Sequence, residues 1–91
     1  MKFKLGQIVA TPGALNALEV TGETAQTYIN RHNSGDWGDL DEEDRAANDA
    51  ALILGEEQRI LSAYKLSDGT KIWIITEWDR SVTTILLPEE Y

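Results

Sequence analysis

The chain has 91 residues, 42% of them hydrophobic, and a formal net charge of −8. This length fits one domain, 1–91, and this hydrophobic content is typical of a globular protein rather than a disordered one. The absence of cysteine excludes a disulfide scaffold, a zinc–thiolate site and thiol catalysis, and the excess of acid argues against direct nucleic-acid binding through phosphates.

A short strand and two helices are expected first. Residues 3–10 contain the apolar residues of a short strand. Thr11 is followed by proline at the first helical position, so it is an N-cap that predicts a helix over 12–19. Thr24 is a second N-cap and predicts a helix over 25–32, which a glycine-containing turn ends.

A third helix is predicted to begin at Asp39 or Asp41 and to end near residue 54. Apolar side chains recur along it at helical spacing. Asp44 and Asn48 lie within that apolar stripe, and polar groups that face a core must be hydrogen-bonded. We expect them to bind backbone groups of the preceding loop or of a neighbouring strand. The alternative is that they line a pocket.

The second half of the chain is predicted to be an antiparallel β-meander. Its strands are expected over 59–66, 71–78 and 81–87, joined by two-residue turns at Asp68-Gly69 and Asp79-Arg80. The fold class is therefore α+β, with two or three helices packed on one face of a three- to four-stranded antiparallel β-meander.

Two-residue turns would fix the register and sort the strand side chains by face. The face expected beneath the helices contains Leu61, Ala63, Ile72, Ile74, Ile85 and Leu87. The other face contains Ser62, Tyr64, Trp73, Ile75, Glu77, Thr84 and Leu86. A slip of one residue at the second turn would move Thr84 to the first face. We expect the second face to be partly exposed, as a functional surface or a homodimer interface through Tyr64 and Trp73.

The negative charge is concentrated in one part of the chain. Residues 36–57 contain nine acids and one base, Arg45, a local charge of −8 that equals the net charge of the chain. Acids near a helix N-terminus are favoured by the helix dipole, so a solvated helix face explains many of them. The alternative is an acidic surface that meets a basic protein partner.

A calcium loop is a weaker interpretation of the same acids. Asp39, Asp41 and Glu43 have the spacing of the first ligands of such a loop. Asp44 and Ala50, however, occupy the positions that the loop gives to glycine and glutamate. We therefore expect no metal and no cofactor.

The single histidine, His32, is expected near the end of the second helix, where a histidine is favoured as a C-terminal cap. As a general acid or base it needs a polar partner. The catalytic candidates are His32, Asp36, Ser62, Tyr64, Glu77, Arg80 and Thr84. The binding candidates are Trp37, Asp44, Asn48, Tyr64 and Trp73. Trp37 lies between glycines and is expected to be a buried anchor of its loop.

Several longer motifs carry a resemblance that covers nearly the whole chain. They are RHNSGDWGDL at 31–40, followed by Asp44 and Asn48, then RILSAY at 59–64, IWIITE at 72–77 and DRSVTTILLPEEY at 79–91. Together they resemble a family of small uncharacterised bacterial proteins, usually labelled hypothetical or plasmid-related and sometimes type I restriction endonuclease subunit M. A methyltransferase fold and its cofactor loop do not fit in this length, so the resemblance implies a mobile-element setting and no activity.

Two functions follow as hypotheses. The first is a non-enzymatic interaction or regulatory protein, associated with plasmids or mobile elements, that binds a basic partner through the acidic helix and the aromatic sheet face. The alternative is a small metal-independent ribonuclease or toxin, because helices followed by a meander resemble the arrangement of barnase and RelE-type nucleases. His32 would then act as acid or base and Arg80 would stabilise phosphate charge. The negative net charge weighs against an RNA substrate.

The location of the protein is also an expectation. Gly6 and Gln7 interrupt the apolar run that a secretory signal needs, and no window approaches the length of a membrane span. We expect a cytoplasmic protein without a membrane partner.

Overall fold

The computed structural model describes residues 3–53 and 58–91. Its elements, in chain order, are β1 (Gln7–Ala10), α1 (Pro12–Thr21), α2 (Ala25–Asn33), α3 (Glu42–Ile53), β2 (Ile60–Lys65), β3 (Lys71–Thr76), β4 (Val82–Leu86) and a short 3-10 helix η1 (Pro88–Glu90). The α+β class is confirmed. The predicted end of the third helix at residue 54 lies outside the described residues.

The local signals that set the helix ends act as expected. Thr11 accepts a hydrogen bond from the Ala14 amide, and Gly22 adopts the left-handed conformation that ends α1. At α3, the carboxylate of Asp41 accepts from the amide of Asp44, so Asp41 rather than Asp39 caps this helix.

The sheet has the strand order β1-β4-β3-β2 and is mixed, because β1 runs parallel to β4. The prediction of a purely antiparallel sheet is therefore wrong. The β2–β3–β4 part is an antiparallel meander, as hairpin turns require. No turn connects β1 to β4, since α1, α2, α3, β2 and β3 lie between them in the chain, so no local signal fixes their relative direction.

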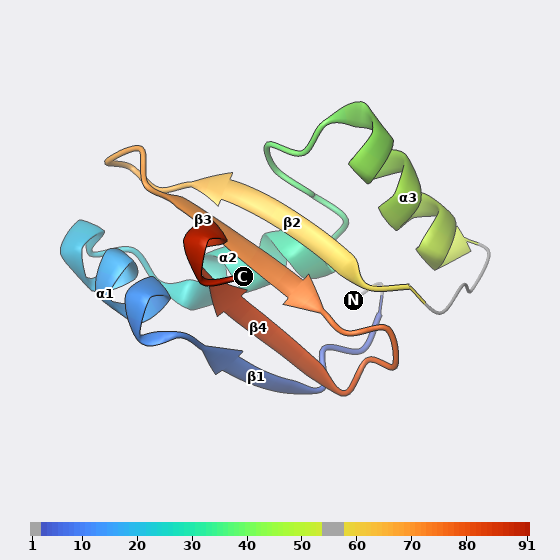
Figure 1. Cartoon of the computed structure of the whole chain (residues 1–91), viewed down its shortest axis with the longest axis horizontal. Coiled ribbons are helices and arrows are strands. Elements are labelled where there is room, and N and C mark those ends of the chain that lie inside the picture. Colours follow the sequence, from blue (N-terminus) through green and yellow to red (C-terminus); the bar gives the residue numbers. More distant parts are fainter. Residues whose placement is uncertain (1–2, 54–57) are drawn as a thin grey trace.

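Two helices, not three, cover one face of the sheet. Figure 1 shows α2 behind the strands, α1 at one end of the sheet, and α3 beyond the outer edge of β2. The main core lies between α1, α2 and the sheet. It comprises Ala14, Leu18, Tyr28, Ile29, Tyr64, Leu66, Ile72, Ile74 and Ile85.

The register of the first hairpin differs from the prediction by one residue. Leu66 and Thr70 close a three-residue loop, Ser67–Gly69, in which Gly69 has a φ of 88°. A three-residue loop with a left-handed glycine is a common hairpin connection. As a result Ser62 lies opposite Ile74 and Tyr64 opposite Ile72, on the face that the helices cover. The predicted grouping of Ser62 and Tyr64 with Trp73 is wrong.

The second hairpin has the predicted register with a longer turn. Trp73 lies opposite Leu86 and Ile75 opposite Thr84. The amide of Glu77 binds the carbonyl of Val82, so the loop has four residues rather than two. The face without a helix, called the uncovered face, therefore carries Leu61, Ala63, Trp73, Ile75, Thr84 and Leu86. Only Trp73 and Thr84 are half-buried there, because Leu61, Ile75 and Leu86 form a buried cluster of their own and Ala63 is buried too.

Candidate functional site

His32, near the end of α2, lies in a chain of hydrogen bonds beneath the sheet. Its Nδ1 atom is 2.5 Å from the Ser62 hydroxyl on β2, and its Nε2 atom is 2.9 Å from the Thr76 hydroxyl on β3. Thr76 is bonded at 2.8 Å to Thr83 on β4, whose hydroxyl donates to the carbonyl of Leu5. This series of hydrogen bonds thus runs from β2 through β3 and β4 to the segment before β1.

The direction of these hydrogen bonds follows from the carbonyl at one end. Thr83 donates its only proton to the Leu5 carbonyl, so it accepts from Thr76. Thr76 has then used its proton and accepts from Nε2–H of His32. Nδ1 of the neutral ring is left as the acceptor for the Ser62 hydroxyl.

This serine–histidine pair is sealed inside the protein. His32, Ser62, Thr76 and Thr83 all have 0% exposure, and Phe3 and Trp37 flank the imidazole ring. Burial lowers the pKa of His32 to about 4, from an ordinary value of 6.5, so the ring is neutral at pH 7. Among the described residues, these four side chains leave no exposed surface, and a structural role explains their contacts.

Asp36 belongs to a second, separate cluster. Its carboxylate forms an ion pair with Arg31 at 2.7 Å and accepts from the amide of Gly38, while its carbonyl accepts from the Tyr64 hydroxyl. The Arg31 guanidinium lies 4.5 Å from the centre of the Tyr64 ring, a cation–π distance. The ion pair lowers the pKa of Asp36, and burial raises the pKa of Tyr64 to about 12. Asp36 therefore fixes its loop rather than serving His32.

Trp37 is buried and anchors its loop, as predicted. Trp37 is 4% exposed, packs with Ala51 and Ile60, and donates its indole N–H to Asp49 on α3. Gly38 is required here because a Cβ on it would lie 2.0 Å from the carbonyl oxygen of Ala63 and because its φ is 73°. The loop can thus lie directly against β2.

The two polar residues of α3 have different environments. Asn48 is 3% exposed, and its amide both donates to the carbonyl and accepts from the N–H of Leu61 on β2. The prediction that Asp44 or Asn48 binds backbone is confirmed through Asn48. Asp44 is exposed and lies beside a groove on the uncovered face of the sheet.

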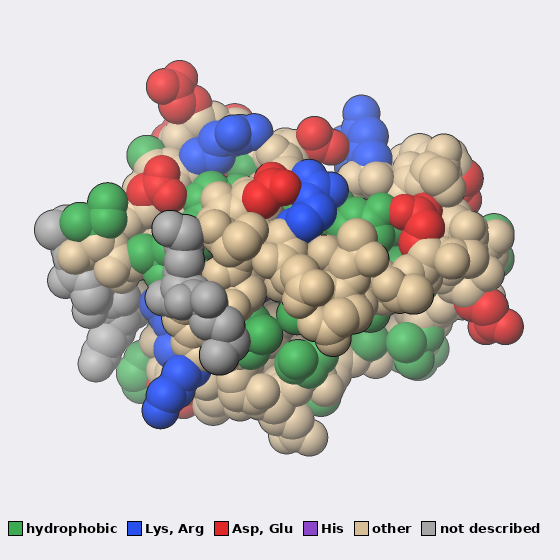
Figure 2. Space-filling model, turned by 180° about the vertical axis from the view of Figure 1, so that it is seen from behind, with side chains coloured by type: hydrophobic (Ala, Val, Ile, Leu, Met, Phe, Trp, Pro, Cys, Tyr) green, Lys and Arg blue, Asp and Glu red, His purple; other side chains and the backbone are tan. Residues whose placement is uncertain are grey.

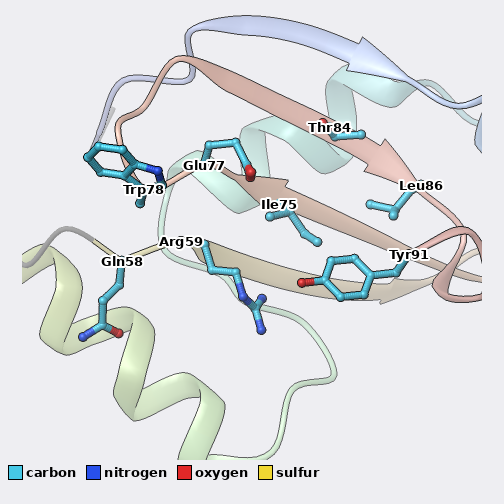
Figure 3. A pocket seen from close by; sticks show the side chains of 8 residues that line it. All are labelled: Gln58, Arg59, Ile75, Glu77, Trp78, Thr84, Leu86 and Tyr91. Carbon is cyan, nitrogen blue, oxygen red and sulfur yellow. The ribbon is translucent and has the colours of Figure 1, made fainter.

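That uncovered face carries two neighbouring hollows that share Arg59 and Tyr91. The first has a volume of about 490 Å³. In Figure 3, Trp78 and Tyr91 stand at opposite ends of it, over a floor that includes Ile75 and Leu86. Trp78 and Tyr91 are 55% and 72% exposed, so both aromatic rings are available for contact.

The second hollow, of about 440 Å³, joins the aromatic face to the acidic segment. We call it the acidic groove. It is lined by Asp39, Leu40, Asp41, Asp44, Arg59, Leu61, Ala63, Tyr64, Lys71, Trp73 and Tyr91. The Trp73 and Tyr91 rings are 5.7 Å apart in an edge-to-face arrangement. Three carboxylates therefore stand beside an apolar and aromatic floor, together with the two basic side chains of Arg59 and Lys71.

The remaining predicted site residues do not join His32. Glu77 and Thr84 line the first hollow, on the uncovered face. Arg80 donates to the carbonyls of Gln58, Glu77 and Trp78, which holds the β3–β4 loop against the start of β2. Of the catalytic candidates, only Ser62 contacts His32 in the part of the chain that the structure describes.

Arg59 and Tyr91 were missed as site residues. Each lies outside the strands, and their proximity follows from η1, which returns the end of the chain to the uncovered face. Pro88 after the last strand and the exposed aromatic Tyr91 were the available signals. Neither shows from sequence which side of the sheet the chain end takes.

Comparison with known proteins gives no match: no family model matches the chain, and no curated protein or solved structure is significantly similar to it. Among the described residues, no group of three or more potential metal ligands converges. None of the described helices has the length and apolar character to cross a membrane.

Proposed function

We propose that the protein is a non-enzymatic interaction protein that binds a basic protein partner in the acidic groove. The observation that carries this proposal is the composition of the groove. Asp39, Asp41 and Asp44 stand next to Trp73 and Tyr91 in one hollow, where these acids outnumber the two basic residues of the lining, Arg59 and Lys71. Carboxylates beside aromatic rings suit a segment that combines lysine or arginine with apolar side chains.

The charge distribution supports the same partner. The acids of residues 36–57 are close to one another in the chain, and the groove receives three of them. A surface of this kind attracts basic segments at long range and repels nucleic acid. A site on the partner that otherwise holds phosphates fits this chemistry. The plasmid or mobile-element setting belongs to the same proposal and rests on the resemblance of motifs alone.

The contacts of His32 favour this function over a nuclease. A general acid or base must reach the proton that it transfers, whereas His32 has 0% exposure and both ring nitrogens are bonded inside the core. Arg80, the proposed phosphate ligand, is committed to three backbone carbonyls. Neither residue has the access that RNA cleavage needs.

The test is a titration of isotope-labelled protein with a short peptide of alternating lysine and leucine, followed by NMR. We expect shifts at the Asp44 amide and the Trp73 indole, which belong to the groove, and none at the buried Trp37 indole. Raising salt from about 50 to about 300 mM should weaken binding about tenfold, since both partners are charged. A peptide of glutamate and leucine should not bind.

A matched pair of variants locates the binding surface. Asp44 and Glu43 lie in the same first turn of α3, but only Asp44 lines the acidic groove. Asp44→Asn should weaken peptide binding about threefold, and Glu43→Gln by much less, although both remove one charge. Equal effects of the two variants, or binding that ignores salt, would show that the groove is not the site.

A further inference from the structure

The outer edge of β1 is an open strand edge. β1 pairs only with β4, and Figure 1 shows it as the last strand on its side of the sheet. The amides of Gln7 and Thr11 bind carbonyls of β4 and the loop before it. Along a strand, the N–H and C=O groups of successive residues point to opposite sides. Since Gln7 and Thr11 point toward β4, the N–H and C=O groups of Ile8 and Ala10 point outward. Among the described residues, no other group bonds to them.

The side chains at this edge are apolar and accessible. Ile8 is 45% exposed and Val9 is 37% exposed. The strand Gln7–Ala10 is short, with four residues, but it carries no charge, no proline and no bulge, and each of these commonly prevents an edge strand from pairing. An edge with these properties is a template for an added strand.

The scarcity of acidic residues around the β1 edge makes a second copy of this protein a suitable partner. Residues 1–18 contain no acid, although the chain carries a net charge of −8. In the back view of Figure 2, most red side chains lie in the upper half of the molecule, and the lower edge, where Figure 1 places β1, is largely hydrophobic or uncharged. Two copies of this acidic chain can therefore meet here without bringing acid against acid.

Two acids do lie near the ends of the strand, and local hydrogen bonds hold both. Glu90 accepts from the Thr11 hydroxyl and from the amide of Leu87. Asp79 accepts from the hydroxyl and amide of Ser81. These bonds lower the pKa of both carboxyl groups and direct their oxygens toward their own chain.

We propose that β1 is a homodimer interface, in which two copies pair their β1 strands antiparallel about a two-fold axis at Val9. Ile8 of one copy then lies opposite Ala10 of the other, and each such pair exchanges both of its outward backbone hydrogen bonds. Val9 lies opposite its own equivalent, where apolar side chains make a cross-strand contact. The two sheets become one continuous sheet, and the acidic grooves remain on the β2 side of each copy. This inference is independent of the proposed function.

The test is the oligomeric state of the full chain, measured by sedimentation and solution scattering from micromolar to millimolar concentration. We expect the mass to rise to twice that of one chain, with a radius of gyration well above the 12.4 Å of the single chain. A chain that remains a monomer throughout this range would overturn the proposal.

Two pairs of variants identify the interface. Ile8→Pro removes one outward N–H while leaving the bonds to β4, so it should abolish the dimer, whereas Ile8→Val should keep it. Val9→Lys places like charges opposite each other and should also abolish the dimer, whereas Val9→Thr should not. Circular dichroism and the thermal midpoint show that each variant is folded. If Ile8→Pro does not fold, Val9→Lys decides, and a dimer that survives in folded Val9→Lys would overturn the assignment to this edge.

Discussion

β2 and β1 are the two edges of one sheet, and they differ in how their backbone is used. Along β2, the amide of Ala63 binds the carbonyl of Trp37, its carbonyl accepts from Asp39, and Asn48 binds both backbone groups of Leu61. Along β1, the outward groups of Ile8 and Ala10 have no such partners among the described residues. The Trp37 loop and α3 therefore cover one edge, and the other is left for pairing.

This difference shows the structural role of the loop that contains Trp37 and Gly38. Gly38 permits a close backbone approach that a Cβ would prevent, and the buried Trp37 and Asn48 hold the loop and helix in place. An exposed sheet edge is an aggregation hazard, so covering the outward groups of Leu61 and Ala63 on β2 favours strand addition at the β1 edge instead. Stability is accordingly expected to depend strongly on residues at the β2 edge and weakly on those at the β1 edge.

The largest expected effect is at the loop that covers β2. Trp37→Ala should lower the free energy of unfolding by about 3 to 5 kcal/mol, because it leaves a cavity beside Ala51 and Ile60 and removes the partner of Asp49. Urea denaturation measures the loss. Trp78→Ala, at a 55% exposed position, is the control and should cost under about 1 kcal/mol. Equal losses would contradict the assignment of Trp37 to the core.

The next effect concerns the hydrogen bonds that link the two edges through His32. Its folded pKa of about 4 lies below the ordinary 6.5, so below pH 6.5 the unfolded state takes up a proton that the folded state does not. The contribution of His32 to the free energy of unfolding is therefore complete above pH 6.5. It decreases by about 3 kcal/mol as the pH falls toward 4.

Urea denaturation between pH 7.5 and 4.5 measures this loss. His32→Gln should be less stable than the original chain at pH 7.5 but should lack the pH dependence of this range. The carboxyl groups with a lowered pKa, which are Glu23, Asp36, Asp68, Asp79 and Glu90, contribute mainly at lower pH. Stability that is constant from pH 6.5 to 4.5, or an unchanged slope in His32→Gln, would contradict a buried neutral histidine.

A smaller effect is expected from the amide that binds Leu61. Asn48→Leu removes both partners of the Leu61 backbone groups and should cost about 2 kcal/mol, since buried polar groups lose their hydrogen bonds. Asn16→Leu changes an exposed residue of α1 in the same chemical way and should change stability by less than about 0.5 kcal/mol. Thermal denaturation distinguishes the two, and similar midpoints would show that α3 does not hold the β2 edge.

The smallest effect is expected at the open edge. Ile8→Thr retains a β-branched residue and the backbone donor, at a position that is 45% exposed. In dilute solution it should change the free energy of unfolding by no more than about 0.5 kcal/mol. A loss of several kcal/mol, measured by urea denaturation, would mean that the β1 edge is covered after all.

The elements that local signals specify were predictable from the sequence. The caps at Thr11 and Gly22 define α1, and the alternating segments define the meander. The first hairpin was not fixed in the same way, because Asp68-Gly69 is compatible with loops of two and of three residues. That one-residue difference moved Ser62 and Tyr64 to the covered face.

The parts of the site that depend on non-local pairing were not predictable. Ser62 was a candidate partner of His32, but the continuation through Thr76 and Thr83 requires the observed register of three strands. The direction of β1 and the return of Tyr91 to the uncovered face have no turn signal near them. The burial of Trp37 and the backbone bonds of Asn48 were predictable, because a large aromatic residue between glycines and a polar group within an apolar stripe each need a specific environment.

Amide hydrogen exchange at the two edges tests the central claim most directly. In dilute solution, the amides of Leu61 and Ala63, which bond to Asn48 and Trp37, should exchange slowly, and those of Ile8 and Ala10 should exchange rapidly. At millimolar concentration Ile8 and Ala10 should become protected while Leu61 and Ala63 remain unchanged. Rapid exchange at Leu61 and Ala63, or slow exchange at Ile8 and Ala10 at every concentration, would contradict a sheet with one covered and one open edge.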